Sequence, residues 1–240
     1  MTKIVVNGKL PKNPIVVEGF PSKGFVSTIS ANYLIRELGM KCVGYIDSDD
    51  MRGITVIKDS TPMRPIRIYV KDNIILIYSE VMVPYNSIPK ISNAINDWLD
   101  RVKPKMVVLM AGITGLEAEK GHEIHGVVSD VEMGRMLENS KVKLIKDGVL
   151  TGVSSDILMH CIENKIHTIG LVVETEYSPD VLAAATMLEI INKLLNVKVN
   201  INTLKNMGDQ VETDFKKLIN QMKKGREGYV KMEECGPMYG

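Results

Sequence analysis

Three glycine-rich turns are the first stretches of this sequence that could support chemistry. They read GFPSKG at 19–24, AGITG at 111–115 and DGVLTG at 147–152. A glycine turn between a strand and a helix can bind phosphate, because unpaired backbone N–H groups and the positive end of the helix dipole both face the anion. None of the turns has the GxGxxG or GxxxxGK pattern, and any α/β sheet needs glycines in its tight turns. They are candidate contacts for a nucleoside or phosphorylated ligand through Gly19, Gly24, Gly112, Gly115, Gly148 and Gly152.

A nucleophilic serine is the second kind of chemistry to consider. Ser154 lies in GVSSD, with His160 six residues later. The nucleophile elbow of the α/β hydrolases needs a glycine on both sides of the serine, and here Asp156 stands at the second of these positions. We therefore expect Ser154 or Ser155 to cap a helix.

The third kind of chemistry to consider is metal binding. His122 and His125 in GHEIH are three residues apart, whereas the metalloprotease helix places its histidines four apart, and the segment has little helical character. A solvated loop is the expectation for this segment. The run DSDD at 47–50 lacks the glycine and the distal glutamate of a calcium loop, so it too is expected to be a polar loop.

Two carboxylates follow the apolar run HTIGLVV, where α/β proteins place their sites. Glu174 and Glu176 flank one residue, and alternate residues of an extended segment face opposite ways. They are not expected to work as an acid–base pair. The sequence thus offers no convincing catalytic set, and we predict a non-enzymatic protein without a cofactor or a metal.

The composition of the chain limits its possible partners and its location in the cell. The chain has 240 residues and a net charge of +1, which gives no indication of a nucleic-acid or membrane partner. Cys42, Cys161 and Cys235 form no CxxC pair, and the first two lie in apolar stretches, as expected in a reducing compartment. The first residues do not resemble a signal peptide, and no apolar run is long enough to span a bilayer. We expect a soluble, cytoplasmic protein.

Strand and helix patterns alternate along the chain. Apolar runs rich in β-branched residues predict strands, and apolar residues at spacings of three and four predict helices. Two strands joined at Asp72 and Asn73 form an expected hairpin, and Ser178 or Asp180 is expected to cap a helix that has Pro179 near its first turn. The expected strands are 14–20, 41–46, the two arms of 64–80, 103–112 and 167–174, and the expected helices are 24–40, 87–102, a segment within 147–166, and 178–196. This alternation predicts an α/β fold of three layers, with a mostly parallel central sheet and helices on both faces.

The last predicted helix, 203–224, has a sharper apolar pattern. One face carries Leu204, Met207, Val211, Phe215, Leu218 and Met222. This face must be buried, either on the domain's own body or between subunits. Gly225 and Gly228 then end the pattern, so we expect one domain over 1–224 and a flexible tail over 225–240.

Three blocks of sequence resemble the proteasome assembly chaperone family in its archaeal and bacterial branch. They are VVEGFPSKGFVSTISANYLIRELGMKCVGYI, GVLTGVSSDIL and IGLVVETEYSPDVLAAATMLEIINKLLNVKVNINTL, in this order. The sequence departs from the family pattern at Ser27, where glycine is common, and at Val181 and Leu182, where proline and arginine are usual. The resemblance implies a Rossmann-like domain similar to nucleoside phosphorylases and hydrolases, ATP-independent and without established enzymatic activity. It also implies a homo-oligomer, for which we expect three to five subunits.

The final residues Met238, Tyr239 and Gly240 fit the pattern of a hydrophobic residue, a tyrosine and any residue. Proteasome activators that resemble this chain insert such a tail between adjacent α-subunits of the core particle. Met238 and Tyr239 supply apolar area, and the Gly240 carboxylate supplies a charge for a lysine of the pocket.

Three functions remain open at this point. The first is docking on the proteasome α-ring through Met238, Tyr239 and Gly240. The second is a phosphorylase- or hydrolase-type enzyme with a ligand at the glycine turns, and the third is an oligomeric scaffold that sequesters its own tail.

Overall fold

A computed structural model describes residues 2–114, 122–206, 208–217 and 219–221 of the chain. Its strands are β1 (Thr2–Val6), β2 (Ile15–Gly19), β3 (Lys41–Ser48), β4 (Val56–Lys58), β5 (Thr61–Met63), β6 (Ile66–Lys71), β7 (Ile74–Ser79), β8 (Met106–Ile113), β9 (Ile124–Val128), β10 (Lys143–Leu144) and β11 (Thr168–Glu174). Its helices are α1 (Val26–Glu37), α2 (Ile88–Val102), α3 (Val131–Asn139), α4 (Val153–Glu163), α5 (Val181–Leu195) and α6 (Ile201–Asn206).

Nine of the described strands form one sheet in the order β1-β3-β6-β7-β2-β8-β11-β9-β10. The four central strands β7, β2, β8 and β11 are parallel, as predicted. The strands beyond β7 pair antiparallel, and so does β9 with β11. The predicted hairpin is confirmed: β6 and β7 are joined at Asp72 and Asn73, and Asp72 has a φ of 49°.

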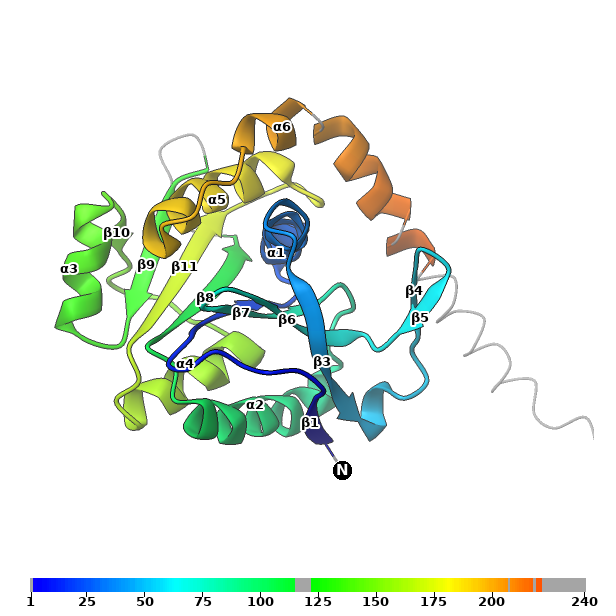
Figure 1. The fold of residues 1–240 in the computed structure, drawn as a ribbon. Coiled ribbons are helices and arrows are strands. Elements are labelled where there is room, and N and C mark those ends of the chain that lie inside the picture. Colours follow the sequence, from blue (N-terminus) through cyan, green and yellow to red (C-terminus); the bar gives the residue numbers. More distant parts are fainter. Residues whose placement is uncertain (1, 115–121, 207, 218, 222–240) are drawn as a thin grey trace, which may run out of the picture.

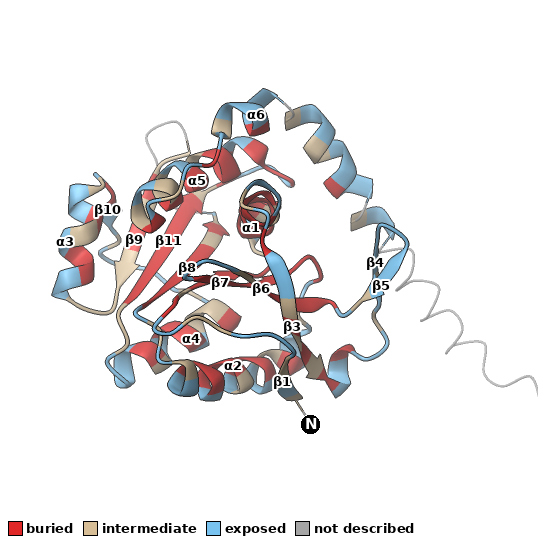
Figure 2. Ribbon diagram, in the orientation of Figure 1, coloured by how far each residue is buried: buried red, intermediate tan, exposed pale blue. Residues whose placement is uncertain are grey.

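Helices cover both faces of the sheet, so the three-layer α/β prediction is confirmed. Figure 1 shows α1 and α5 on one face and α2 and α4 on the other. Alternate residues of the central strands serve the two layers. Val17 and Val108 pack in the core beneath α1 and α5, whereas Val16 and Val107 pack in the core beneath α2 and α4. The strands between the layers are accordingly buried along most of their length (Figure 2).

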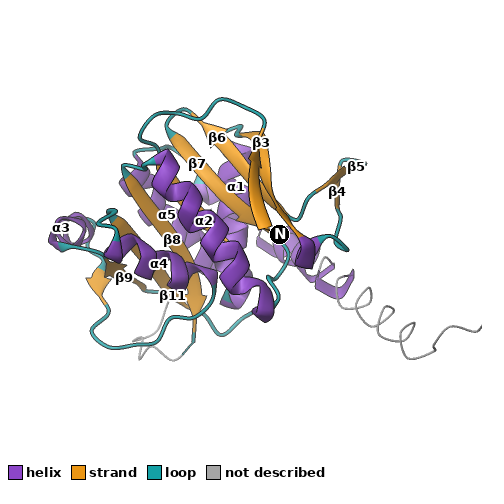
Figure 3. Ribbon diagram, turned by 90° about the horizontal axis from the view of Figure 1, so that it is seen from below, coloured by secondary structure: helices purple, strands orange, loops and turns teal. Residues whose placement is uncertain are grey.

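Several elements were not predicted. These are β1, the hairpin of β4 and β5, β9, α3 and β10, all of them short or weakly patterned. The β4–β5 hairpin projects from the body in two views (Figures 1 and 3). Of the two cysteines in apolar stretches, Cys161 is buried, whereas Cys42 at the start of β3 is exposed.

The C-terminal helical region begins earlier than predicted, with α6 at Ile201, and continues through 208–217 and 219–221. Leu204 and Phe215 are buried, and Val211 packs against the same core beneath α1 and α5. The Phe215 ring lies 6.2 Å from that of Phe25. For these residues, packing on the chain's own body is confirmed; Met207, Leu218 and Met222 lie outside the described residues. No described helix combines the length and hydropathy needed to cross a bilayer.

Candidate functional site

The carboxyl ends of β2 and β8 form the topological switch point of the sheet. After β2 the chain turns toward the side of β3, β6 and β7, and after β8 it turns toward the side of β9, β10 and β11. Open α/β sheets bind their ligands beside such a point. The loops there form the candidate functional site, and we call this end of the central strands the carboxyl edge.

A buried carboxylate, which the sequence analysis did not single out, lies at the end of β2. Glu18 is 1% exposed, and its Oε1 accepts a hydrogen bond from the Phe20 N–H at 2.7 Å. Desolvation raises the pKa of this carboxyl to about 7, although hydrogen bonds from Ser154 and Phe20 oppose the rise. A single charge in the apolar strand IVVEG was the signal that could have identified it.

Ser154 does not cap a helix, so that prediction was wrong. The N-cap of α4 is Gly152, whose φ of 92° favours glycine, and neither Ser154 nor Ser155 makes a side-chain cap. The Ser154 hydroxyl instead donates to Glu18 Oε2 at 2.8 Å. It therefore joins α4 to the end of β2. His160, the other residue of the serine hypothesis, bonds through Nε2 to Asp100 at 2.9 Å and is not part of this contact.

The turn after β2 is held by hydroxyl groups. Ser22 Oγ accepts from the Gly112 N–H at 2.9 Å and lies 2.8 Å from Ser27 Oγ. The Ser27 hydroxyl also donates to the Phe20 carbonyl. At Ser27, where the family pattern has glycine, this sequence thus gains a hydroxyl that ties the turn to the first turn of α1.

The chain's own atoms closely approach the glycines of this turn. A Cβ on Gly112 would lie 2.1 Å from the Lys23 carbonyl oxygen, and a Cβ on Gly19 would lie 2.4 Å from Ala31 Cβ. Gly24 has a φ of 67°, and a Cβ on it would lie 2.8 Å from Thr175 Cγ2. Close packing therefore accounts for these three glycines. Gly148 and Gly152 lie in the loop before α4, and Gly115 lies outside the described residues.

The loop after β11 is rigidly fixed at its base. The Thr175 hydroxyl lies 2.5 Å from Asp180 Oδ2 and 3.2 Å from the Tyr177 carbonyl oxygen. Asp180 caps α5 by accepting from the Ala183 N–H at 2.9 Å, which selects it over Ser178 as the predicted cap. Its own N–H donates to the Gly24 carbonyl at 2.9 Å. Glu176 and Tyr177 are exposed at the tip, while Glu174 is half-buried at the end of β11.

The polar segments considered for metal binding are placed differently from expectation. His125 lies in β9, so the loop prediction was wrong for it, whereas His122 precedes the strand and lies 3.6 Å from Asp180 Oδ2. Asp47 belongs to β3 and lies within 4 Å of Arg52 and Arg64, and Asp50 pairs with Lys90 at 3.0 Å. Within the described part of the chain, no three His, Cys, Asp or Glu side chains are grouped to hold a metal ion.

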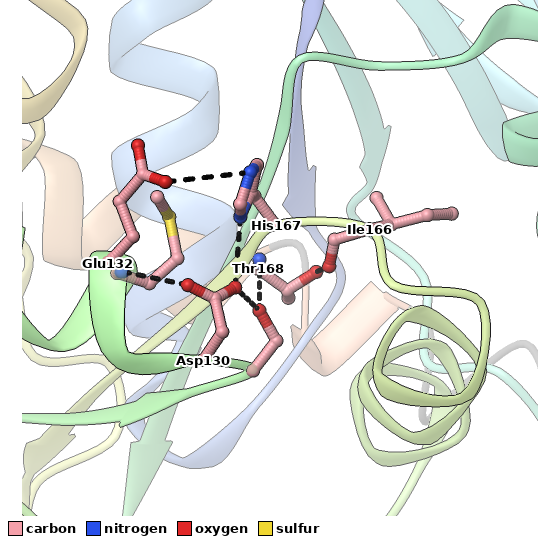
Figure 4. A network of polar contacts seen from close by, with 7 residues as sticks. Asp130, Glu132, Ile166, His167 and Thr168 are labelled. Carbon is pink, nitrogen blue, oxygen red and sulfur yellow. Dashed lines mark hydrogen bonds and ion pairs between the residues drawn. The ribbon is translucent and has the colours of Figure 1, made fainter.

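The opposite end of the parallel strands, the amino edge, carries a second polar network (Figure 4). His167 Nδ1 lies 2.9 Å from Asp130 Oδ2, and Asp130 caps α3 through the Met133 N–H at 3.1 Å. Burial acts to raise the pKa of Asp130, but hydrogen bonds from Ser129, His167 and the Met133 N–H outweigh it and lower the pKa to about 2.

Beside this network lies a hollow of about 280 Å³, which we call the basic hollow. Leu99, Pro104 and Ile166 supply its apolar lining, and Lys103, Lys165 and His167 supply positive or polar groups. Its one carboxylate, Asp100, bonds to His160. Lys103 is the C-cap of α2, and Lys165 follows Asn164, the C-cap of α4; helix C-termini favour cations nearby.

The three residues predicted to bind a partner, Met238, Tyr239 and Gly240, lie outside the described residues.

The strand order and the helices on both faces of the sheet make this protein a doubly wound α/β domain. Comparison with known proteins then gives its family. The model of the PAC2 family matches residues 16–219, and the chain belongs to this family. The resemblance drawn from the three sequence blocks is thereby confirmed.

Individual relatives extend the match along the whole chain. The chain is 31% identical over 243 residues to the uncharacterized protein MJ0106 of Methanocaldococcus jannaschii, with 99% of this chain and 98% of that protein covered. The crystal structure of Pyrococcus furiosus PbaA, an archaeal homolog of proteasome-assembly chaperone, matches at a TM-score of 0.85 and 30% identity, covering 94% of this chain and 100% of PbaA.

The fold is shared more widely. Pyrococcus furiosus PbaB, an archaeal proteasome activator, matches at a TM-score of 0.74 and 21% identity, covering 90% of this chain and 98% of PbaB. At this identity the match concerns the fold alone.

Proposed function

We propose that this chain is a non-enzymatic proteasome assembly chaperone homologue that docks on the α-ring of the core particle through Met238, Tyr239 and Gly240. The observation that carries the proposal is the similarity to PbaA at 30% identity across the full length of that protein. The proposal also places the chain in the cytoplasm, where it acts without ATP or another cofactor.

The chemistry of the last residues supports the docking mode. Met238 and Tyr239 offer apolar area and one hydroxyl, and the Gly240 carboxylate offers a charge that a lysine can bind. One short segment of this kind binds weakly, because its ordering costs conformational entropy. Several copies presented by one oligomer bind a ring of subunits more tightly through their effective concentration. Self-association into three to five subunits is therefore part of the proposal.

The carboxyl edge supports a non-enzymatic role. Glu18 and Ser154 bond to each other, and Glu18 is buried. Gly19, Gly24 and Gly112 each lie against atoms of the chain itself. These groups are used to join β2, β8, β11 and α4 into one structure.

Surface plasmon resonance against an immobilised archaeal core particle tests the docking. We expect the full chain to bind and the chain lacking residues 238–240 to lose binding, with both forms keeping the same melting temperature. Tyr239→Ala isolates the aromatic contribution, and one extra residue after Gly240 displaces the carboxylate while it retains both side chains. Undiminished binding of the truncated chain would contradict the docking mode.

A further inference from the structure

The two ends of β11 carry opposite and complementary chemistry. Lys165 and His167 precede the strand and line the basic hollow, while Glu176 and Tyr177 follow it. The seven residues of β11 separate these two surfaces by about 20 Å, at about 3.3 Å per residue. One molecule therefore presents an acidic, aromatic projection at its carboxyl edge and, at its amino edge, a recess that carries two lysines and one carboxylate, Asp100.

The loop that carries Tyr177, residues 175–180, has the properties of an interface anchor. The Tyr177 side chain is 68% exposed, although it is among the largest apolar side chains of the chain. The base of the loop is fixed to β8 by the hydrogen bond from the Thr175 N–H to the Ile113 carbonyl, and to the turn after β2 by the Asp180 N–H. A rigid loop loses little entropy on binding, and exposed tyrosines on such loops are typical binding hot spots.

The basic hollow has the properties of a receptor for such an anchor. Its volume of about 280 Å³ is below the usual range of small-molecule pockets, about 300–1,000 Å³, and fits a single large side chain. Pro104 and Ile166 are partly exposed and offer apolar contact. Neither Lys103 nor Lys165 forms an ion pair with any acidic group among the described residues, so both ammonium groups can meet a carboxylate such as that of Glu176.

We propose that this chain self-associates head to tail, with the Tyr177 loop of one copy seated in the basic hollow of the next and Glu176 facing Lys165. The inference rests on the self-association that forms part of the proposed function. Pairing of the Tyr177 loop with a second Tyr177 loop would set Glu176 against Glu176, which disfavours contact between two such loops. A heterologous contact between opposite edges generates a ring or an open filament.

Charge exchange tests the contact, with sedimentation velocity over a range of protein concentrations as the measurement. Lys165→Glu and Glu176→Lys each create a like-charge contact, and each should weaken self-association about tenfold or more. The two substitutions in one chain restore an opposite pair and should return the dissociation constant to near the wild-type value. Tyr177→Ala removes the anchor and should weaken association by about 30-fold. Lys3→Glu and Lys58→Glu, on exposed residues of β1 and β4, are matched controls that should change nothing.

The outcomes separate the possibilities. If either single reversal is silent, or the double reversal is no better than the singles, the head-to-tail contact is overturned while self-association stands. If the wild type is a monomer at every concentration, the head-to-tail contact and self-association are both refuted. Binding to the core particle then tests the docking role independently. If deletion of residues 238–240 dissociates the assembly, these residues make the contact between copies and the Tyr177 assignment is wrong. The melting temperature of every variant serves as the folding control, since all the substituted side chains are exposed or half-exposed.

Discussion

The Ser154 hydroxyl donates a hydrogen bond to Glu18 Oε2 across 2.8 Å and so joins the first turn of α4 to the end of β2. The carboxylate accepts one further bond from the Phe20 N–H and is otherwise surrounded by the core. Among the described residues two donors stabilise this buried charge, and burial is the stronger influence on its pKa.

Stability is predicted to depend on pH through Glu18. The pKa is raised from 4.5 to about 7 in the folded chain, so the folded state binds the proton more tightly than the unfolded state. The stabilisation that this group contributes is fully present below about pH 4.5, and it is lost as the pH rises through about 7. The loss is on the order of 3 kcal/mol, at about 1.4 kcal/mol per pKa unit.

Urea titrations of the wild type and Glu18→Gln between about pH 4.5 and 8 check this prediction. The glutamine can still accept from the Phe20 N–H and can donate to Ser154, so its stability should be nearly flat over this range. Asp130 does not affect the stability change in this pH range, because its lowered pKa of about 2 confines its effect to lower pH. Equal slopes for the two proteins would show that another group is responsible.

Gly112 is predicted to tolerate no side chain. A Cβ there would lie 2.1 Å from the Lys23 carbonyl oxygen, and backbone on both sides must move to relieve the clash. Gly112→Ala should lower the free energy of unfolding by about 1–3 kcal/mol or more. Gly53→Ala is the matched control, because nothing lies within 4 Å of its Cβ position. A stability loss equal to that of the control would contradict the packing role.

The central sheet and its covering helices were predictable because their apolar periods are long. In α2, for example, Ile91, Ile95 and Leu99 recur at every fourth position, and all three are buried. The short strands β9 and β10 carry no such pattern, and pairing with β11 rather than local preference places His125 in a strand. The sequence predicts the chemistry of residues one by one, but the ends of separate strands come together only in the fold.

The candidate site, too, was predictable from the sequence only in part. Gly19, Gly24 and Gly112 were recognised as special positions, yet the sequence could not show that neighbouring atoms occupy the space beside them. Glu18 and Ser154 are 136 residues apart, so no spacing rule connects them. The basic hollow likewise combines residues that follow two different helices.

Removing one partner of the buried ion pair of Arg67 and Glu80 is predicted to lower the stability strongly, whereas replacing both partners by apolar residues is predicted to lower it little. Arg67 is 1% exposed, pairs with Glu80 and lies 5.3 Å from the Tyr78 ring. Glu80→Leu leaves the guanidinium buried without its counter-charge, which should cost about 3–5 kcal/mol of unfolding free energy. The double variant Arg67→Met with Glu80→Leu removes both charges and should recover most of this loss. Chemical denaturation of the three proteins measures the difference, and a double variant as unstable as the single would refute the reasoning.

Phe215 is predicted to hold the C-terminal helical residues 208–217 against the body. Its ring is 7% exposed and packs 6.2 Å from Phe25, whose φ of 54° places it at the left-handed N-cap of α1. The neighbouring residues of this helical segment are mostly exposed, so few other contacts oppose its detachment. In Phe215→Ala we expect hydrogen exchange across 208–217 to accelerate about tenfold or more, while the exchange of β2 and β8 changes little. Lys216→Ala, at the exposed adjacent position, is the control. Uniform acceleration across the whole sheet would mean that the segment unfolds with the core and that Phe215 is part of one cooperative unit.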